Sequence, residues 1–202
     1  MATNIDIKAV EQRAWRSFFS DGRLELTFGL AFLLMGLLII TSEEGLLYWI
    51  MVAALLIIPG SVGIICKKFI SEPRIGRVTF SRKRRLNMAG AVLFLAAAVL
   101  FGMAAWLVMP SFSPATGSWL SANWVLVLLI AKVVLVFAAI AYFLDYWGVF
   151  IIGLGLAASF FAREVWGTAI LFFIVGAVIT LFGIGKLVTF IRKNPVVPAE
   201  EE

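Results

Sequence analysis

One cation lies deep inside an otherwise apolar stretch of this sequence. Lys132 follows the run 125–131 and precedes the run 133–136, and both runs are entirely apolar. It stands about ten residues from either end of the stretch, or about 15 Å of helix rise, which is too far for its stem to reach a membrane surface. Placing such a lysine in a spanning helix costs about 2.5–3.5 kcal/mol. Lys132 is therefore expected to face a bundle interior, a polar cavity or a partner subunit.

Three further polar residues complete the candidate intramembrane site with Lys132: Glu25, Ser159 and Thr180. Glu25 lies near the end of its apolar stretch and is expected to pair with Arg23 or Lys186, or to favour the positive end of a helix. The hydroxyls of Ser159 and Thr180, and backbone carbonyls near Pro59, are candidate partners for Lys132. One interpretation is a transport or ion site. The other is a structural lysine bonded to carbonyls or paired across a subunit interface.

The residue types that are missing exclude several chemistries. The chain has no His and one Cys, which removes histidine-ligated zinc, histidine-ligated haem, Ser-His-Asp triads and any disulfide within the chain. No group of carboxylates converges on the middle of a span. We therefore expect no catalytic residue, no metal and no cofactor, and we expect Cys66 to be a packing residue.

The composition identifies the environment of these residues. Of the 202 residues, 62% are apolar and 14% are charged, and the mean hydropathy is +1.03. Soluble domains are roughly 45–50% apolar and about 25% charged. A soluble globular protein, a disordered chain and a nucleic-acid-binding domain are therefore excluded.

Six apolar stretches are long enough for spanning helices, which need about 20 residues. The chain is predicted to be an all-α integral membrane protein, a six-helix transmembrane bundle with an N-terminal interfacial amphipathic helix. The membrane domain covers 24–193, and the acidic tail 194–202 is predicted to be disordered. The six stretches are Leu24–Thr41, Leu46–Cys66, Leu86–Met109, Ala122–Leu144, Tyr146–Ala162 and Trp166–Gly185.

The first 23 residues form the predicted cytoplasmic arm. Ile7, Val10, Ala14 and Phe18 recur at helical spacing, with basic residues largely on other faces. This pattern is typical of a helix lying on the inner leaflet. Asp21 is expected to cap the first span.

The basic residues predict the orientation. Fifteen of the seventeen lie in the arm, in the loop 67–85 or at the C-terminal end, whereas Arg163 alone lies on the opposite side and Lys132 lies within a span. Positive charge favours the cytoplasm, so both termini and this loop are predicted to be cytoplasmic. The loop is also a candidate contact for anionic lipid headgroups, at about 1 kcal/mol per cation, and the alternative is a specific anionic ligand or protein partner. Its basic residues are Lys67, Lys68, Arg74, Arg77, Arg82, Lys83, Arg84 and Arg85.

A short motif in this loop suggests relatives. The pairs Asp21-Gly22, Gly29-Leu30 and Gly36-Leu37 precede Pro73-Arg74-Ile75-Gly76-Arg77-Val78. Over residues 15–85 the chain resembles a group of uncharacterised bacterial membrane proteins with a Pro-Arg-x-Gly-Tyr-Val-type loop between spans two and three. Arg77 stands where that group has an aromatic residue. The resemblance implies a bacterial inner-membrane setting and no particular activity.

These observations favour a non-catalytic membrane scaffold or subunit. Its expected partners are membrane lipids with anionic headgroups, and either a second copy of the chain or another protein; nucleic acid is not expected. The alternative function is a small transporter or channel with a site near Lys132.

Overall fold

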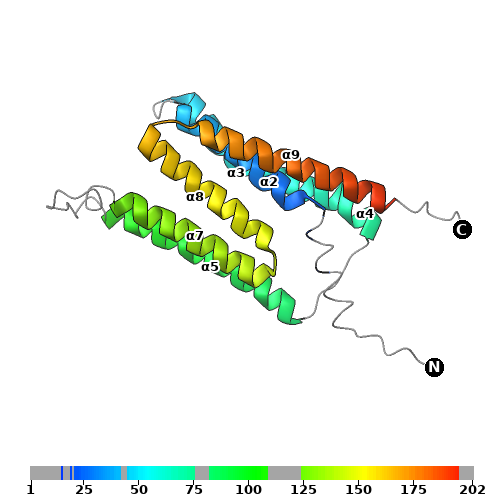
Figure 1. Cartoon of the computed structure of the whole chain (residues 1–202). Helices are drawn as coiled ribbons and strands as arrows, with labels where there is room; N and C mark the ends of the chain where they lie inside the picture. Colours follow the sequence, from blue (N-terminus) through cyan, green and yellow to red (C-terminus); the bar gives the residue numbers. More distant parts are fainter. Residues whose placement is uncertain are drawn as a thin grey trace, which may run out of the picture. The chain divides into compact units, whose positions relative to one another are not determined.

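The structure is a computed structural model that describes residues 15, 19, 21–41, 45–75, 82–108 and 124–195. All the secondary structure in these ranges is helical (Figure 1). The elements are α2 (Arg23–Ile40), α3 (Leu46–Ile65), the π-helix η1 (Cys66–Ser71), α4 (Glu72–Ile75), α5 (Arg82–Val108), α7 (Trp124–Leu144), α8 (Trp147–Trp166) and α9 (Ile170–Lys193).

Five helices are long and apolar enough to cross a membrane: α2, α3 with its extension to Arg74, α7, α8 and α9. The chain is a multi-span helical membrane protein. The predicted third span corresponds to α5, in which the apolar stretch found among the described residues is the shorter segment Leu86–Ala98. Most of the predicted arm lies outside the described residues. Two of its aromatic residues are described, and both are buried, with Trp15 1% exposed and Phe19 5% exposed.

The contacts divide the chain into two compact units. Unit 1 holds α2, α3, η1, α4 and α9, and unit 2 holds α5, α7 and α8. In unit 1, α2 packs against both α3 and α9 (Figure 1). In unit 2, α7 packs against both α5 and α8.

Glycines allow α2 and α9 to approach closely. A Cβ on Gly29 would overlap the Thr180 side chain and lie 2.6 Å from the Thr180 nitrogen, and a Cβ on Gly36 would lie 3.0 Å from the Phe173 ring. The later glycine in α2, Gly36, contacts the earlier residue in α9, Phe173, whereas Gly29 contacts Thr180. The two helices are therefore antiparallel. Close backbone approach through small residues is a main source of helix association in membranes.

Two residues, Asp145 and Tyr146, make the sharp turn between α7 and α8 within unit 2. Asp145 adopts a left-handed conformation (φ 52°) between the end of α7 and Tyr146. Asp tolerates this region better than most residues because its short side chain hydrogen-bonds locally. The following helix α8 packs on α7 through Gly153, where a Cβ would overlap Phe137.

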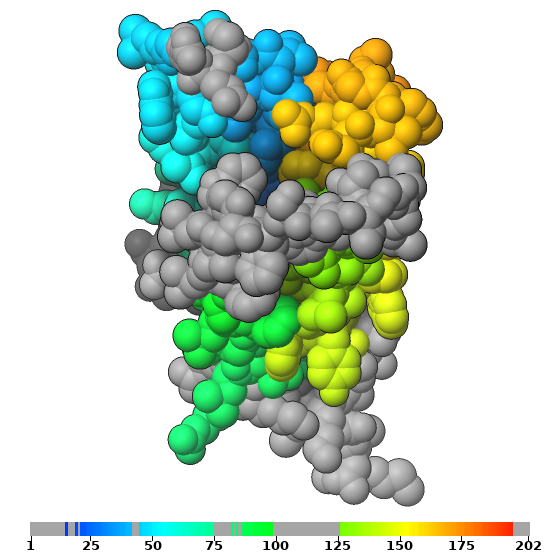
Figure 2. Space-filling model, turned by 90° about the vertical axis from the view of Figure 1, so that its left-hand side faces the viewer, coloured from blue at the N-terminus to red at the C-terminus, as the bar shows by residue number. Residues whose placement is uncertain are grey.

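The surface of the helices is that of a membrane protein. Helix α3 belongs to the light-blue to cyan region of Figure 2. Its exposed large apolar side chains include Leu56 (75%) and Ile64 (67%). Exposed aromatic residues stand at or near helix ends, among them Trp49, Tyr142, Trp147 and Trp166. Aromatic side chains at such positions are typical of membrane interfaces.

The segment predicted as a loop over 67–85 is helical at both ends. The helix of α3 continues through η1 and α4 to Ile75, and α5 already begins at Arg82. Pro73 explains the change to π-helix, because it has no N–H and its ring clashes with the carbonyl four residues earlier, that of Phe69. A widened turn before the proline removes this clash and lets the helix continue.

Candidate functional site

The N-terminal end of α2 is built around a buried aspartate. Asp21 is 3% exposed, and its Oδ1 accepts a hydrogen bond from the backbone N–H of Arg23 at 3.1 Å. Gly22 occupies the cap position with φ 74°, a left-handed conformation that favours glycine. The prediction that Asp21 is the capping residue is therefore wrong in position, because Gly22 takes the cap and Asp21, one residue earlier, accepts the N–H of the first helical residue.

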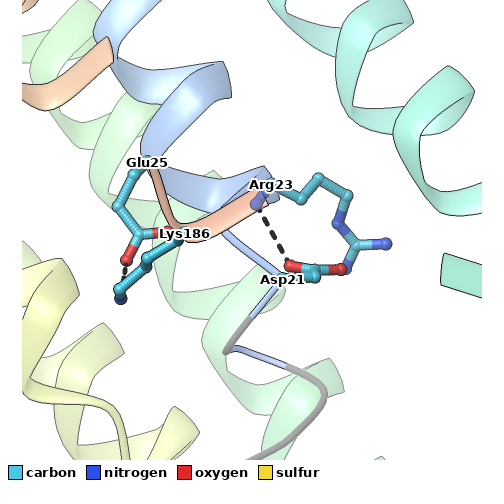
Figure 3. A network of polar contacts seen from close by, with 4 residues as sticks. All are labelled: Asp21, Arg23, Glu25 and Lys186. Atoms are coloured by element: carbon cyan, nitrogen blue, oxygen red, sulfur yellow. Dashed lines mark hydrogen bonds and ion pairs between the residues drawn. The ribbon is translucent and has the colours of Figure 1, made fainter. Parts of the chain in front are cut away.

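A buried ion pair joins α2 to α9 one turn further along. Lys186 donates to Glu25 Oε1 at 2.5 Å, and its Nζ lies 4.9 Å from the centroid of the Phe182 ring. The Glu25 side chain is 4% exposed and that of Lys186 is 27% exposed. Figure 3 shows this pair on one side of the start of α2, with Asp21 and Arg23 on the other. Lys186, one of the two cations predicted as partners of Glu25, forms an ion pair with it.

Asp21 also ties α2 to the π-helical segment. The Ser71 hydroxyl donates to Asp21 Oδ2 at 2.8 Å and lies 3.4 Å from the Cys66 carbonyl oxygen. Cys66 itself is buried, as expected of a packing residue. Ser71 was not among the candidate residues, because a serine in a basic segment carries no signal until the fold brings Asp21 beside it.

The basic residues near η1 differ in exposure. Lys67 and Lys68 are exposed, whereas Arg74 is partly buried, donates from Nη1 to the Ile70 carbonyl at 2.9 Å and buries its Nε. At the start of α5, Arg82 is exposed and Arg84 is half-buried. Arg77 and the side chains of Lys83 and Arg85 lie outside the described residues.

The four candidate intramembrane residues belong to both units. Glu25 and Thr180 lie in unit 1, and Lys132 and Ser159 lie in unit 2. The hydroxyls donate to their own helices, Ser159 to the Gly155 carbonyl at 2.8 Å and Thr180 to the Gly176 carbonyl at 2.7 Å. Lys132 is half-buried in α7. Within the part of the chain that the structure describes, no hydrogen bond joins it to Ser159.

No protein-family model matches the chain, and no curated protein or solved structure matches it. The resemblance over residues 15–85 therefore stays a prediction. The architecture supports a multi-span helical membrane protein on its own, through the five long apolar helices.

Proposed function

We propose that this protein is a non-catalytic scaffold or subunit of a membrane assembly that binds protein or lipid partners. One observation carries the proposal. Four polar side chains in the described spans bond within the protein itself: Glu25 pairs with Lys186 across two helices, and Ser159 and Thr180 bond to carbonyls of their own helices. The ion pair fixes α2 against α9, and the two hydroxyls are already engaged, whereas a transport path needs polar groups facing a cavity.

The proposed topology has six spans, with α5 as the third. The basic residues at the start of α5 and at the end of α9 then lie on the cytoplasmic side with both termini. We place the protein in a bacterial inner membrane, which rests on the sequence resemblance.

Lys132 is the proposed contact with a partner subunit. It is the ninth of the 21 residues of α7, about 12 Å of rise from the start and about 18 Å from the end. An ammonium group at this depth needs a counter-charge, because an isolated charge is costly in lipid. A carboxylate on a neighbouring chain would supply it.

The second candidate function is a small transporter or channel with its site at Lys132. The depth and half-burial of Lys132 favour it, because ionisable residues at mid-span mark ion and substrate paths in many transporters. In the scaffold, the Lys132 side chain contacts a carboxylate of a neighbouring chain. In the transporter, it faces an ion or substrate path.

The Lys132→Met variant separates the two functions, with Lys193→Met as the control, since Lys193 is exposed at the end of α9. Both variants and the wild type are purified from native membranes in mild detergent, and their masses and thermal stabilities are compared. For the scaffold we expect K132M to lose a co-purifying subunit or a second copy that K193M retains. An unchanged mass of K132M contradicts the scaffold. An unchanged mass with raised thermal stability supports the transporter, because the lysine is then kept at a cost to folding.

A further inference from the structure

The side chains along η1 and α4 fall into two groups: a clamped side, whose residues are buried or hydrogen-bonded within the protein, and an outward side, whose residues are exposed. On the clamped side, Ser71 bonds to Asp21, Cys66 is buried, and Arg74 bonds back to the Ile70 carbonyl. The Ser71–Asp21 hydrogen bond joins the segment to the residues just before α2. The π-helical segment is therefore fixed to the other helices of unit 1.

The outward side carries two cations and an aromatic ring. Lys67 and Lys68 are exposed, Phe69 is 65% exposed, and the Lys68 Nζ lies 5.9 Å from the Phe69 ring centroid. At the end of α3, on the other side of the buried Cys66 in the sequence, Ile64 (67%) and Ile65 (52%) expose apolar side chains. An apolar surface thus changes to a cationic one within two turns of continuous helix.

We propose that Lys67, Lys68 and Phe69 form a binding site for one anionic phospholipid, with the headgroup phosphate at the two ammonium groups and an acyl chain along Phe69, Ile65 and Ile64. Lysines beside a membrane surface attract anionic headgroups. A free phosphate ion would use the lysines but not the apolar residues, so the combination favours a lipid. The proposal identifies one lipid partner of the proposed scaffold. It rests on the proposed function in one respect, that α3 spans the membrane.

The test uses the full chain in detergent, titrated with short-chain phosphatidylglycerol and with phosphatidylcholine of the same chain length, and it counts bound lipid by native mass spectrometry. The variant is K67Q/K68Q. Its control is R192Q/K193Q, which removes the same charge from exposed residues at the end of α9 in the same unit. We expect K67Q/K68Q to bind phosphatidylglycerol about tenfold more weakly or worse, with the control near wild type.

A second variant separates lipid from free anion. Phe69→Ser keeps both lysines. We therefore expect this variant to bind phosphatidylglycerol more weakly than the wild type and to bind inorganic phosphate equally well. Equal losses in K67Q/K68Q and R192Q/K193Q would overturn the site in favour of general surface attraction. Unchanged lipid binding in F69S, or equal binding of phosphatidylcholine, would also overturn it.

The outcome is distinguishable from that of the proposed function. Lipid binding by purified protein depends on neither the orientation in the membrane nor Lys132. If K67Q/K68Q binds lipid like the control but K132M loses a subunit, the lipid site is wrong and the scaffold function is retained. If K67Q/K68Q loses lipid binding but the mass of K132M is unchanged, the lipid site is retained and the scaffold function is wrong.

Discussion

Lys186 of α9 and Glu25 of α2 form an ion pair between residues 161 positions apart in the sequence. The pair lies beside the close approach of Gly22 and Gly183, where a Cβ on Gly183 would lie 2.7 Å from the Leu26 nitrogen. A tight backbone contact and a charge contact thus join the same ends of the two helices. The first and last long helices of unit 1 consequently depend on each other for their position.

Removing one partner of this pair should cost more than removing both. Lys186→Met leaves the Glu25 carboxylate buried beside an apolar chain, and loss of one partner of a buried pair costs about 3–5 kcal/mol. We expect the lower end of that range because Lys186 is 27% exposed. The double variant E25Q/K186M should recover much of the loss. Unfolding in a denaturing-detergent titration measures both, and a double variant less stable than K186M would contradict a direct coupling.

The glycine at the centre of the α2–α9 contact should not tolerate a methyl group. Gly29→Ala places a Cβ against the Thr180 side chain and 2.6 Å from its nitrogen, so the helices must move apart. Overpacking of this kind costs about 1–3 kcal/mol. Gly60→Ala in α3 is the matched control, because no atom of the described residues lies within 4 Å of its Cβ position.

Thermal unfolding of the two alanine variants checks this prediction. G60A should equal or exceed the wild type, since alanine favours a helix over glycine by about 1 kcal/mol. In G29A, adding Thr180→Ala should restore only part of the stability, because the backbone of Thr180 remains in place. Equal stabilities for G29A and G60A would show that the helices separate without cost.

Two serines with similar hydrogen-bond lengths should differ in their effect on stability. Ser71→Ala removes the hydroxyl that bonds the buried Asp21 carboxylate at 2.8 Å, and a hydrogen bond to a charged group contributes about 1.5–3 kcal/mol. Ser159→Ala removes a hydroxyl that bonds the Gly155 carbonyl of its own helix, an interaction that slightly destabilises helices. We expect a lowered melting temperature for S71A alone. A larger loss in S159A would contradict the role given to Asp21.

The sequence predicted the helices well and the polar contacts only in part. Apolar length alone located α2, α3, α7, α8 and α9, because a spanning helix needs no long-range information. The predicted boundary between the last two was wrong, because α8 continues past Ala162 to Trp166 and α9 begins only at Ile170. The Glu25–Lys186 pair could be named only as one of two alternatives, since the pairing depends on which helix packs on α2. Ser71 and the π-helical turn were missed, because each depends on a contact or a clash that residue spacing does not display.

The number of spans can be decided by labelling single cysteines in a Cys66→Ala background. Arg82, Glu164 and Lys193 are exposed at the start of α5, near the end of α8 and at the end of α9, so cysteines there should react readily. With six spans, four helices lie between residues 82 and 193, and we expect R82C and K193C to be shielded from an impermeant maleimide on intact cells. E164C should be labelled without permeabilisation. If α5 does not cross, only three crossings separate Arg82 from Lys193, and these two cysteines must label from opposite sides. That result would replace the six-span topology with a five-span one.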